Sequence, residues 1–304
     1  MDIAITGSTG LIGSALTASL TADGHRVVPV VRSAGRTDSV RWDPSSGTIE
    51  GGGLEGLDAV VHLAGEGIAS GPWTKAQLRR IHDSRQQGTH LLASTLAGLA
   101  QPPATLLSGS AIGFYGDRGN DRLSEAAPAG EGFLADVCVA WEAATAPAAD
   151  AGIRVAQLRT GIVLDRNGGA LGKQLPIFKL GLGGKAGKGT QWMSWISLED
   201  EIRAIRFALE TPSISGPVNL VAPTPVTNAE FTKALGAAVH RPTFMPIPRL
   251  VRHAPLGVGD LLESLLFTSA RVEPDALAAA GFAFSHRTIE DGLAAVLGTP
   301  PPSP

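Results

Sequence analysis

The feature that most constrains the fold is a glycine-rich turn between a short apolar strand and an amphipathic helix. The apolar run is Ile3-Ala4-Ile5, and the turn follows as Thr6-Gly7-Ser8-Thr9-Gly10-Leu11-Ile12-Gly13. From Leu11 to Ala22 apolar residues recur at helical spacing, Asp23-Gly24 ends this helix, and Val27 to Val31 forms a second apolar strand. This order predicts a β-α-β unit of the kind that binds dinucleotides.

The three glycines of the turn suit a phosphate-binding role. Gly7 permits the tight turn, Gly10 lets the backbone approach a pyrophosphate, and Gly13 lets the helix pack closely on the strand. The helix N-terminus adds free N–H groups and a partial positive charge. We therefore expect a dinucleotide at this turn; the alternative is a glycine turn that holds no ligand.

The end of the second strand indicates which dinucleotide is bound. A binder of the ribose 2′-hydroxyl places Asp or Glu about 20 residues past the glycines, but this chain has Val30-Val31-Arg32-Ser33 there. The forked donors of Arg32, helped by Arg36, match the oxygens of a 2′-phosphate. The sequence therefore favours NADP(H), unless Arg32 is an ordinary solvated arginine.

Later segments repeat the strand–helix pattern and predict an α/β fold with a parallel sheet. We expect strands at Ala59–Ala64, Ala104–Ser108, Arg154–Leu158 and Val218–Val221, and a long helix over Lys75–Leu99. We divide the chain into a cofactor domain, residues 1–222 with an inserted substrate or lid segment at 161–194, and a smaller C-terminal substrate lobe, residues 223–304. The glycine-rich stretch Gly181–Gly189 is a candidate lid, or else a simple connection.

Composition excludes several functional classes. A formal net charge of −3 provides no basic field for a nucleic acid, and no uncharged apolar run reaches the ~18 residues of a membrane span. Cys138 is the single cysteine, which favours a reducing cytoplasm, and the histidines show no metal-ligand spacing. We expect a cytoplasmic protein with a small-molecule substrate, no metal, no nucleic-acid or membrane partner, and a possible homodimer contact.

Further motifs resemble the extended short-chain dehydrogenase/reductase superfamily and, within it, the atypical "epimerase family protein" branch, labelled NAD-dependent epimerase/dehydratase. The resemblance covers nearly the whole chain and implies a Rossmann-like, doubly wound sheet of seven parallel strands. The residues that carry it are the glycine turn, His62-Leu63-Ala64-Gly65-Glu66, Trp73, Ser84-Arg85, the segment from Ser108 to Gly116, Leu158 to Val163, Leu180 to Gly184 and Ser194-Trp195-Ile196.

The resemblance also implies cofactor contacts. On the phosphate side it assigns Gly7, Thr9, Gly10, Leu11, Ile12 and Gly13, and along the cofactor Leu63, Ala64 and Gly65. The stretch from Leu158 to Val163 would pass near the nicotinamide and supplies Arg159, Gly161 and Val163 as candidates. His62 lies in an apolar strand, so we interpret it first as a core residue.

The superfamily's proton-transfer pair, Tyr-x-x-x-Lys, is missing. Tyr115 is the single tyrosine, and the aligned positions of the pair are occupied by Leu134 and Cys138. Arg85 stands where the superfamily has a helix asparagine, and it cannot relay protons by titrating. No activating neighbour surrounds Cys138, so we interpret it as a packing residue.

Four residues remain as catalytic candidates: Ser110, Tyr115, Glu66 and Arg85. Ser110 would hydrogen-bond a substrate oxygen, and Tyr115 would donate a proton if a neighbour such as Arg85 lowered its pKa. Glu66 would act as a base if desolvation raised its pKa. Structural roles for Tyr115, Glu66 and Arg85 stay open. The sequence thus predicts an NADP(H)-dependent oxidoreductase, or a nucleotide-sugar-like epimerase or dehydratase; the alternative is a catalytically inactive NADP(H)-binding sensor or regulatory protein.

Overall fold

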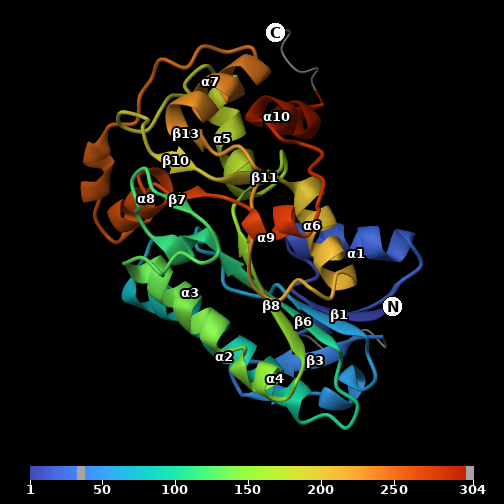
Figure 1. The fold of residues 1–304 in the computed structure, drawn as a ribbon. Helices are drawn as coiled ribbons and strands as arrows, with labels where there is room; N and C mark the ends of the chain where they lie inside the picture. Colours follow the sequence, from blue (N-terminus) through green and yellow to red (C-terminus); the bar gives the residue numbers. More distant parts are fainter. Residues whose placement is uncertain (33–37, 299–304) are drawn as a thin grey trace.

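The computed structural model describes residues 1–32 and 38–298, and its centre is an eight-stranded sheet (Figure 1). The strand order is β12-β8-β6-β5-β1-β2-β3-β4. Each neighbouring pair from β12 to β3 is parallel, whereas β4 is antiparallel to β3. The seven-stranded parallel sheet is therefore confirmed, with a short hairpin strand added at one edge. The strands are β1 Asp2–Thr6, β2 Arg26–Val31, β3 Val40–Asp43, β4 Thr48–Ile49, β5 Ala59–His62, β6 Thr105–Ala111, β8 Arg154–Thr160 and β12 Gly216–Leu220.

Helices cover both faces of the sheet because successive apolar residues of each central strand point to opposite sides. Ile3 and Ile5 pack on the face covered by α1 (Leu11–Ala22) and α6 (Leu198–Glu210), whereas Ala4 packs on the other face. That second face is covered by α2 (Lys75–Ala97) and α4 (Ala146–Asp150), and α3 (Phe133–Ala143) packs against α2. This is the doubly wound arrangement expected from the sequence.

A smaller lobe lies beyond the carboxyl ends of the strands, at the top of Figure 1. Its core joins residues from 161–194 with residues from 222–297, so the predicted insertion and the predicted C-terminal lobe share one apolar cluster. Its elements are β9 Ile162–Leu164, α5 Gly169–Lys179, β10 Trp192–Met193, β11 Trp195–Ser197, β13 Val226–Thr227, α7 Asn228–Ala238, η3 Arg249–His253, α8 Val258–Leu266 and α10 Ile289–Leu297. The paired strands β7 (Arg122–Leu123) and β14 (Arg271–Val272) and the helix α9 (Asp275–Ala279) connect it to the sheet domain. The short helices η1 (Gly51–Leu54) and η2 (Ile112–Tyr115) follow β4 and β6.

The middle of the glycine-rich stretch Gly181–Gly189 is hydrogen-bonded to other parts of the smaller lobe. Ala186 pairs with Ile247, and the Ile247 N–H donates to the carbonyl of Lys185 at 2.9 Å. The Ala186 N–H donates to Asn228 Oδ1 at 2.7 Å. The stretch is thus bonded to two other segments of the lobe, and its role as a lid stays a prediction.

Two further properties bear on function. Within residues 1–32 and 38–298, no helix combines the length and the apolar character needed to cross a bilayer. The same part of the chain contains no cluster of three or more His, Cys, Asp or Glu side chains suited to a metal ion.

Candidate functional site

The β1–α1 turn is held against the end of β5 by backbone contacts that leave no room for side chains. Gly7 has a φ of +69°, and a Cβ atom on it would lie 2.8 Å from the carbonyl carbon of Leu63. A Cβ atom on Gly13 would lie 2.2 Å from the carbonyl oxygen of Gly7. Both positions therefore require glycine, as the sequence pattern indicated.

The first turn of α1 has unpaired donors. Its N-cap residue, Gly10, offers no side-chain acceptor, and the first turn contains no acid. Among the described residues, no backbone carbonyl accepts from the N–H groups of Leu11, Ile12 or Gly13. A Cβ atom on Gly10 would approach only the Gly7 carbonyl, at 3.3 Å, so the outer side of the turn is open. This geometry fits the diphosphate of a dinucleotide, because the helix dipole and free N–H groups both favour an anion.

Buried hydrogen bonds fix the ends of β1 and β5 beside this turn. Thr6 Oγ1 accepts from the N–H groups of Leu63 at 3.0 Å and Ala64 at 3.1 Å. His62 bridges Thr6 Oγ1 at 2.7 Å and Thr89 Oγ1 at 2.9 Å, and its burial lowers its pKa to about 4. A neutral His62 is therefore a core residue that positions the backbone of residues 63–65 next to the turn.

Arg32 lies where the sequence placed it, directly after β2. Its side chain is exposed, and it makes no hydrogen bond or ion pair with another residue of the described chain. Its guanidinium is therefore free to contact a 2′-phosphate. Arg36, its expected helper, lies outside the described residues.

Glu66 and Arg85 meet, but not through the Glu66 carboxylate. Arg85 Nη1 donates to the backbone carbonyls of Glu66 at 2.9 Å and Ile81 at 3.1 Å, and its guanidinium lies 4.8 Å from the ring centre of Trp141. The Glu66 carboxylate instead accepts from Gln77 Nε2 at 3.2 Å. Burial lowers the pKa of Arg85. The hydrogen bond from Arg85 to the Glu66 carbonyl orders the loop after β5.

Ser110 belongs to a buried polar chain that the sequence did not reveal. Ser110 Oγ donates to Glu142 Oε1 at 2.6 Å, and Arg159 holds both oxygens of that carboxylate at 2.8 and 2.9 Å. Arg159 Nη1 also donates to the hydroxyl of Tyr115 at 2.9 Å, which donates to Asn219 Oδ1 at 2.7 Å. These hydrogen bonds link five elements, η2, α3, β6, β8 and β12.

The environment of Tyr115 differs from the expectation in one respect. Its cationic neighbour is Arg159 and not Arg85, because Arg159 reaches the phenol from the adjacent strand β8. Tyr115 is fully buried, and this burial raises its pKa instead of lowering it. The condition for a proton-donating Tyr115, a pKa lowered by a neighbour such as Arg85, is therefore not met.

The remaining candidates lie around the carboxyl end of β8. The side chain of Arg159 is buried in its ion pair, and the Gly161 N–H donates to the Leu220 carbonyl at 3.0 Å. Val163 is half-buried in β9, opposite Ile196 of β11. Contacts of these three residues with a cofactor stay predictions.

The positions of the missing Tyr-x-x-x-Lys pair are used for packing. Leu134 Cβ and Cys138 Sγ lie within 3.4 and 3.7 Å of the position that a Cβ atom on Gly113 would take. Burial raises the pKa of Cys138 to about 11, so its thiol stays protonated at neutral pH. The structure thus agrees with a packing role for Cys138.

Sequence reasoning missed three buried polar residues of the candidate site: Glu142, Asn219 and Glu201. Glu201 is fully buried near the end of β8; its Oε1 accepts from Thr160 at 2.9 Å, its Oε2 has no partner among the described residues, and burial raises its pKa to about 8. The sequence signal that could have found Glu201 was a charged residue on a largely apolar face of the helix that became α6. Trp141-Glu142 offered no such signal, because the partners of Glu142 are distant in the chain.

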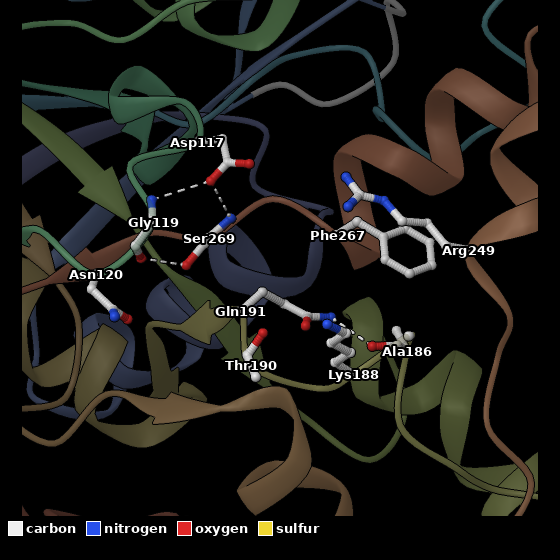
Figure 2. Close-up of a pocket in the computed structure, with 11 residues that line it drawn as sticks. Asp117, Gly119, Asn120, Ala186, Lys188, Thr190, Gln191, Arg249, Phe267 and Ser269 are labelled. Carbon is white, nitrogen blue, oxygen red and sulfur yellow. Dashed lines mark hydrogen bonds between the residues drawn. The ribbon is translucent and has the colours of Figure 1, made fainter.

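A cavity of about 600 Å³ lies between the loop after η2, the loop before β10 and the segment before β14 (Figure 2). Asp117 Oδ1 accepts from the N–H groups of Gly119 at 3.2 Å and Ser269 at 3.4 Å, so its carboxylate is partly satisfied. Lys188 lines the same cavity and pairs with no other described residue, whereas Arg249 pairs with Glu263. The cavity can therefore hold a polar ligand that carries an anionic group.

Comparisons with known proteins agree with this geometry. A model described as the NAD dependent epimerase/dehydratase family matches residues 3–220, and a model described as a domain of unknown function matches residues 249–296. An epimerase family protein of Mycobacterium bovis is 46% identical over 292 residues, covering 96% of each chain. The chain belongs to the NAD-dependent epimerase/dehydratase family. The resemblance stated from the sequence is thereby confirmed.

Solved structures extend the comparison of this epimerase-family chain. The crystal structure of the human epimerase family protein SDR39U1 with NADPH is 34% identical, has a TM-score of 0.89, and the match covers 98% of this chain and 99% of that chain. A UDP-glucose 4-epimerase of Thermus thermophilus in complex with NAD is 20% identical with a TM-score of 0.72, which shows a shared fold.

Proposed function

We propose that this epimerase-family protein binds NADP(H) at the β1–α1 turn and is an oxidoreductase or a nucleotide-sugar-like epimerase or dehydratase. The observation that carries the proposal is the uncapped N-terminus of α1, with three free N–H groups beside an open Gly10. The solved relative named with NADPH supports it. The single buried cysteine supports a reducing compartment such as the cytoplasm.

Each part of the cofactor has candidate partners. The N–H groups of Leu11, Ile12 and Gly13, with Thr9 beside them, would hold the diphosphate, and Arg32 would hold the 2′-phosphate. The backbone of residues 63–65 and 161–163 would line the rest. A bound nicotinamide supplies reversible hydride acceptance, and the residues of this chain bind and orient what reacts with it.

Ser110 determines which form of a substrate oxygen is bound. Its single hydroxyl hydrogen is donated to Glu142, whose carboxylate also accepts two hydrogen bonds from Arg159. Ser110 Oγ therefore offers only lone pairs and accepts a hydrogen bond from a substrate hydroxyl. This polarity favours the alcohol form of a substrate over the carbonyl form at this position.

Calorimetric titration with NADPH and NADH tests the proposal. We expect NADPH to bind at least about tenfold more tightly, and Arg32→Glu to remove that preference because it places a carboxylate beside the 2′-phosphate. Arg287→Glu is the matched control, since the side chain of Arg287 is also exposed and makes no hydrogen bond or ion pair with a described residue. If neither nucleotide binds the wild-type protein, the glycine turn is only a scaffold and the proposal fails.

The second candidate function is a catalytically inactive NADP(H)-binding sensor or regulatory protein. It is favoured by one observation: Ser110, Tyr115 and Arg159 are bonded to one another or to Glu142, and no Tyr-x-x-x-Lys pair stands beside them. The absorbance of reduced nicotinamide distinguishes the two functions. Turnover of the loaded protein with nucleotide sugars or hydroxy acids supports an enzyme, whereas tight binding without turnover across such a panel supports the sensor.

A further inference from the structure

Charge is strongly segregated in the smaller lobe. Residues 166–198 and 231–259 contain nine of the 25 Lys and Arg residues and none of the 28 Asp and Glu residues, in a chain whose net charge is −3. Among the described residues, Arg249 is the only one of these nine cations that pairs with a carboxylate. These two segments of the lobe therefore present a local positive field that the net charge of the whole chain conceals.

Exposed apolar side chains are concentrated in the same two segments. They hold seven of the ten large hydrophobic residues that are exposed in the described chain. Leu180 is 74% exposed and Phe244 is 72% exposed, with Leu182 and Met245 next to them at 51% and 48%. Single exposed leucines are ordinary, but so many in two adjoining segments form a patch that requires an explanation.

Parts of the two segments, residues 179–185 and 241–247, lie side by side in the smaller lobe at the top of Figure 1. Arg241 Nε donates to the carbonyl of Lys179 at 2.8 Å. A Cβ atom on Gly181 would lie 4.0 Å from Pro242, and one on Gly184 would lie 1.8 Å from the Met245 carbonyl oxygen. We define the basic apolar surface as Lys179, Leu180, Leu182, Arg241, Phe244 and Met245.

We propose that the basic apolar surface docks this protein on an anionic lipid bilayer. Leu180, Leu182, Phe244 and Met245 would enter the headgroup and upper acyl region, while Lys179 and Arg241 would contact anionic headgroups. This departs from the expectation of no membrane partner, which rested on the absence of a spanning segment. That observation does not test peripheral binding.

The composition of the surface favours a bilayer over a peptide or a protein groove. Its apolar side chains belong to the C-cap of α5 and to two loops, they stand beside the exposed Lys179 and Arg241, and none of them lines the described cavity. Pro242, Pro246 and Pro248 lack N–H groups, and the Ile247 N–H is already bonded to Lys185. Thr243, Phe244 and Met245 keep backbone N–H groups without a partner among the described residues. We therefore place this backbone at the hydrated headgroup level, with only the side chains of Phe244 and Met245 reaching deeper.

Vesicle flotation of the full chain tests the proposal. We expect binding to vesicles of phosphatidylcholine with phosphatidylglycerol that is about tenfold stronger than to phosphatidylcholine alone, and that weakens at about 0.5 M salt. Phe244→Ser with Leu180→Ser should reduce binding about tenfold, and Lys179→Glu with Arg241→Glu should remove the preference for anionic lipid. Val139→Ser, at a residue 43% exposed on α3, is the matched control.

Three results would overturn the inference. One is an absence of flotation with anionic vesicles, and another is an equal loss of binding in the Val139→Ser control. The third is a dimer, detected by sedimentation without lipid, that Phe244→Ser with Leu180→Ser dissociates, because the surface would then join two copies of this chain. Since all the substituted side chains are exposed, unchanged thermal unfolding separates loss of docking from loss of fold. None of these results depends on nucleotide binding.

Discussion

The two halves of the candidate site, the β1–α1 turn and the region around β6 and α3, present different chemical groups. The β1–α1 turn offers backbone N–H groups, and its glycines at positions 7 and 13 are in contact with other backbone atoms. The region around β6 and α3 offers side chains instead, and Ser110, Glu142, Arg159 and Tyr115 bind one another in the core. The backbone N–H groups of the turn stay available to a ligand. The donors and acceptors of the buried side chains, in contrast, are already paired with one another.

This difference explains why binding is easier to propose than turnover. Free N–H groups at a helix N-terminus bind anions whatever the later chemistry is. Proton transfer needs a titratable group that is both accessible and has a pKa near the operating pH. Tyr115 is buried with a raised pKa, and Cys138 has a pKa of about 11, so neither meets that condition at neutral pH.

The largest expected effect comes from breaking the buried ion pair. Glu142→Ala leaves the guanidinium of Arg159 buried without its carboxylate, and Ser110 loses its acceptor. We expect the free energy of unfolding to fall by about 3–5 kcal/mol, measured by urea denaturation. The control is Glu273→Ala, which breaks the more exposed pair with Arg122 and should cost about 1 kcal/mol or less. Equal losses in the two variants would contradict a special role for the buried pair.

Substitution of Gly13 tests the backbone half of the comparison. Gly13→Ala places a methyl group 2.2 Å from the Gly7 carbonyl, so the turn must shift. We expect a loss of roughly 3 kcal/mol in stability and a loss of NADPH binding in calorimetry. Gly52→Ala, where a Cβ atom meets nothing within 4 Å, should leave both quantities unchanged. Normal NADPH affinity in a folded Gly13→Ala protein would show that the turn is not the nucleotide site.

The sequence predicted the first half of the site well and the second half poorly, for a physical reason. Residues 3–31 form a local unit, so the glycine spacing and apolar periodicity were sufficient to place β1, α1 and β2 within a residue. The partners of Tyr115 are Arg159 and Asn219, which are 44 and 104 residues away. Such contacts depend on which strands become neighbours in the sheet, and no local pattern contains that information.

A buried acid without a cationic partner provides a contrast with Glu142. Glu201 has a pKa raised to about 8, so the folded state keeps its proton while the unfolded state loses it near the ordinary value of 4.5. Stability should therefore fall as pH rises between these values. Glu201→Gln removes this contribution, so the variant should gain on the order of 2 kcal/mol relative to wild type between pH 5.5 and 7.5. Urea denaturation of both proteins across this range measures the difference, and a constant difference would contradict the raised pKa.

The smallest expected effect concerns the phenol of Tyr115. Tyr115→Phe removes the hydroxyl that donates to Asn219 and accepts from Arg159, but it leaves the ring in its apolar cluster and the pair of Arg159 with Glu142 intact. We expect a loss of about 1 kcal/mol in stability and an unchanged NADPH affinity. Because Tyr115 is the only tyrosine, the absorbance of its phenolate reports it alone among tyrosines, and ionisation should coincide with alkaline unfolding. A phenol that ionises in the folded protein below its ordinary pKa would restore Tyr115 as a catalytic candidate and show that the side-chain half of the site is accessible after all.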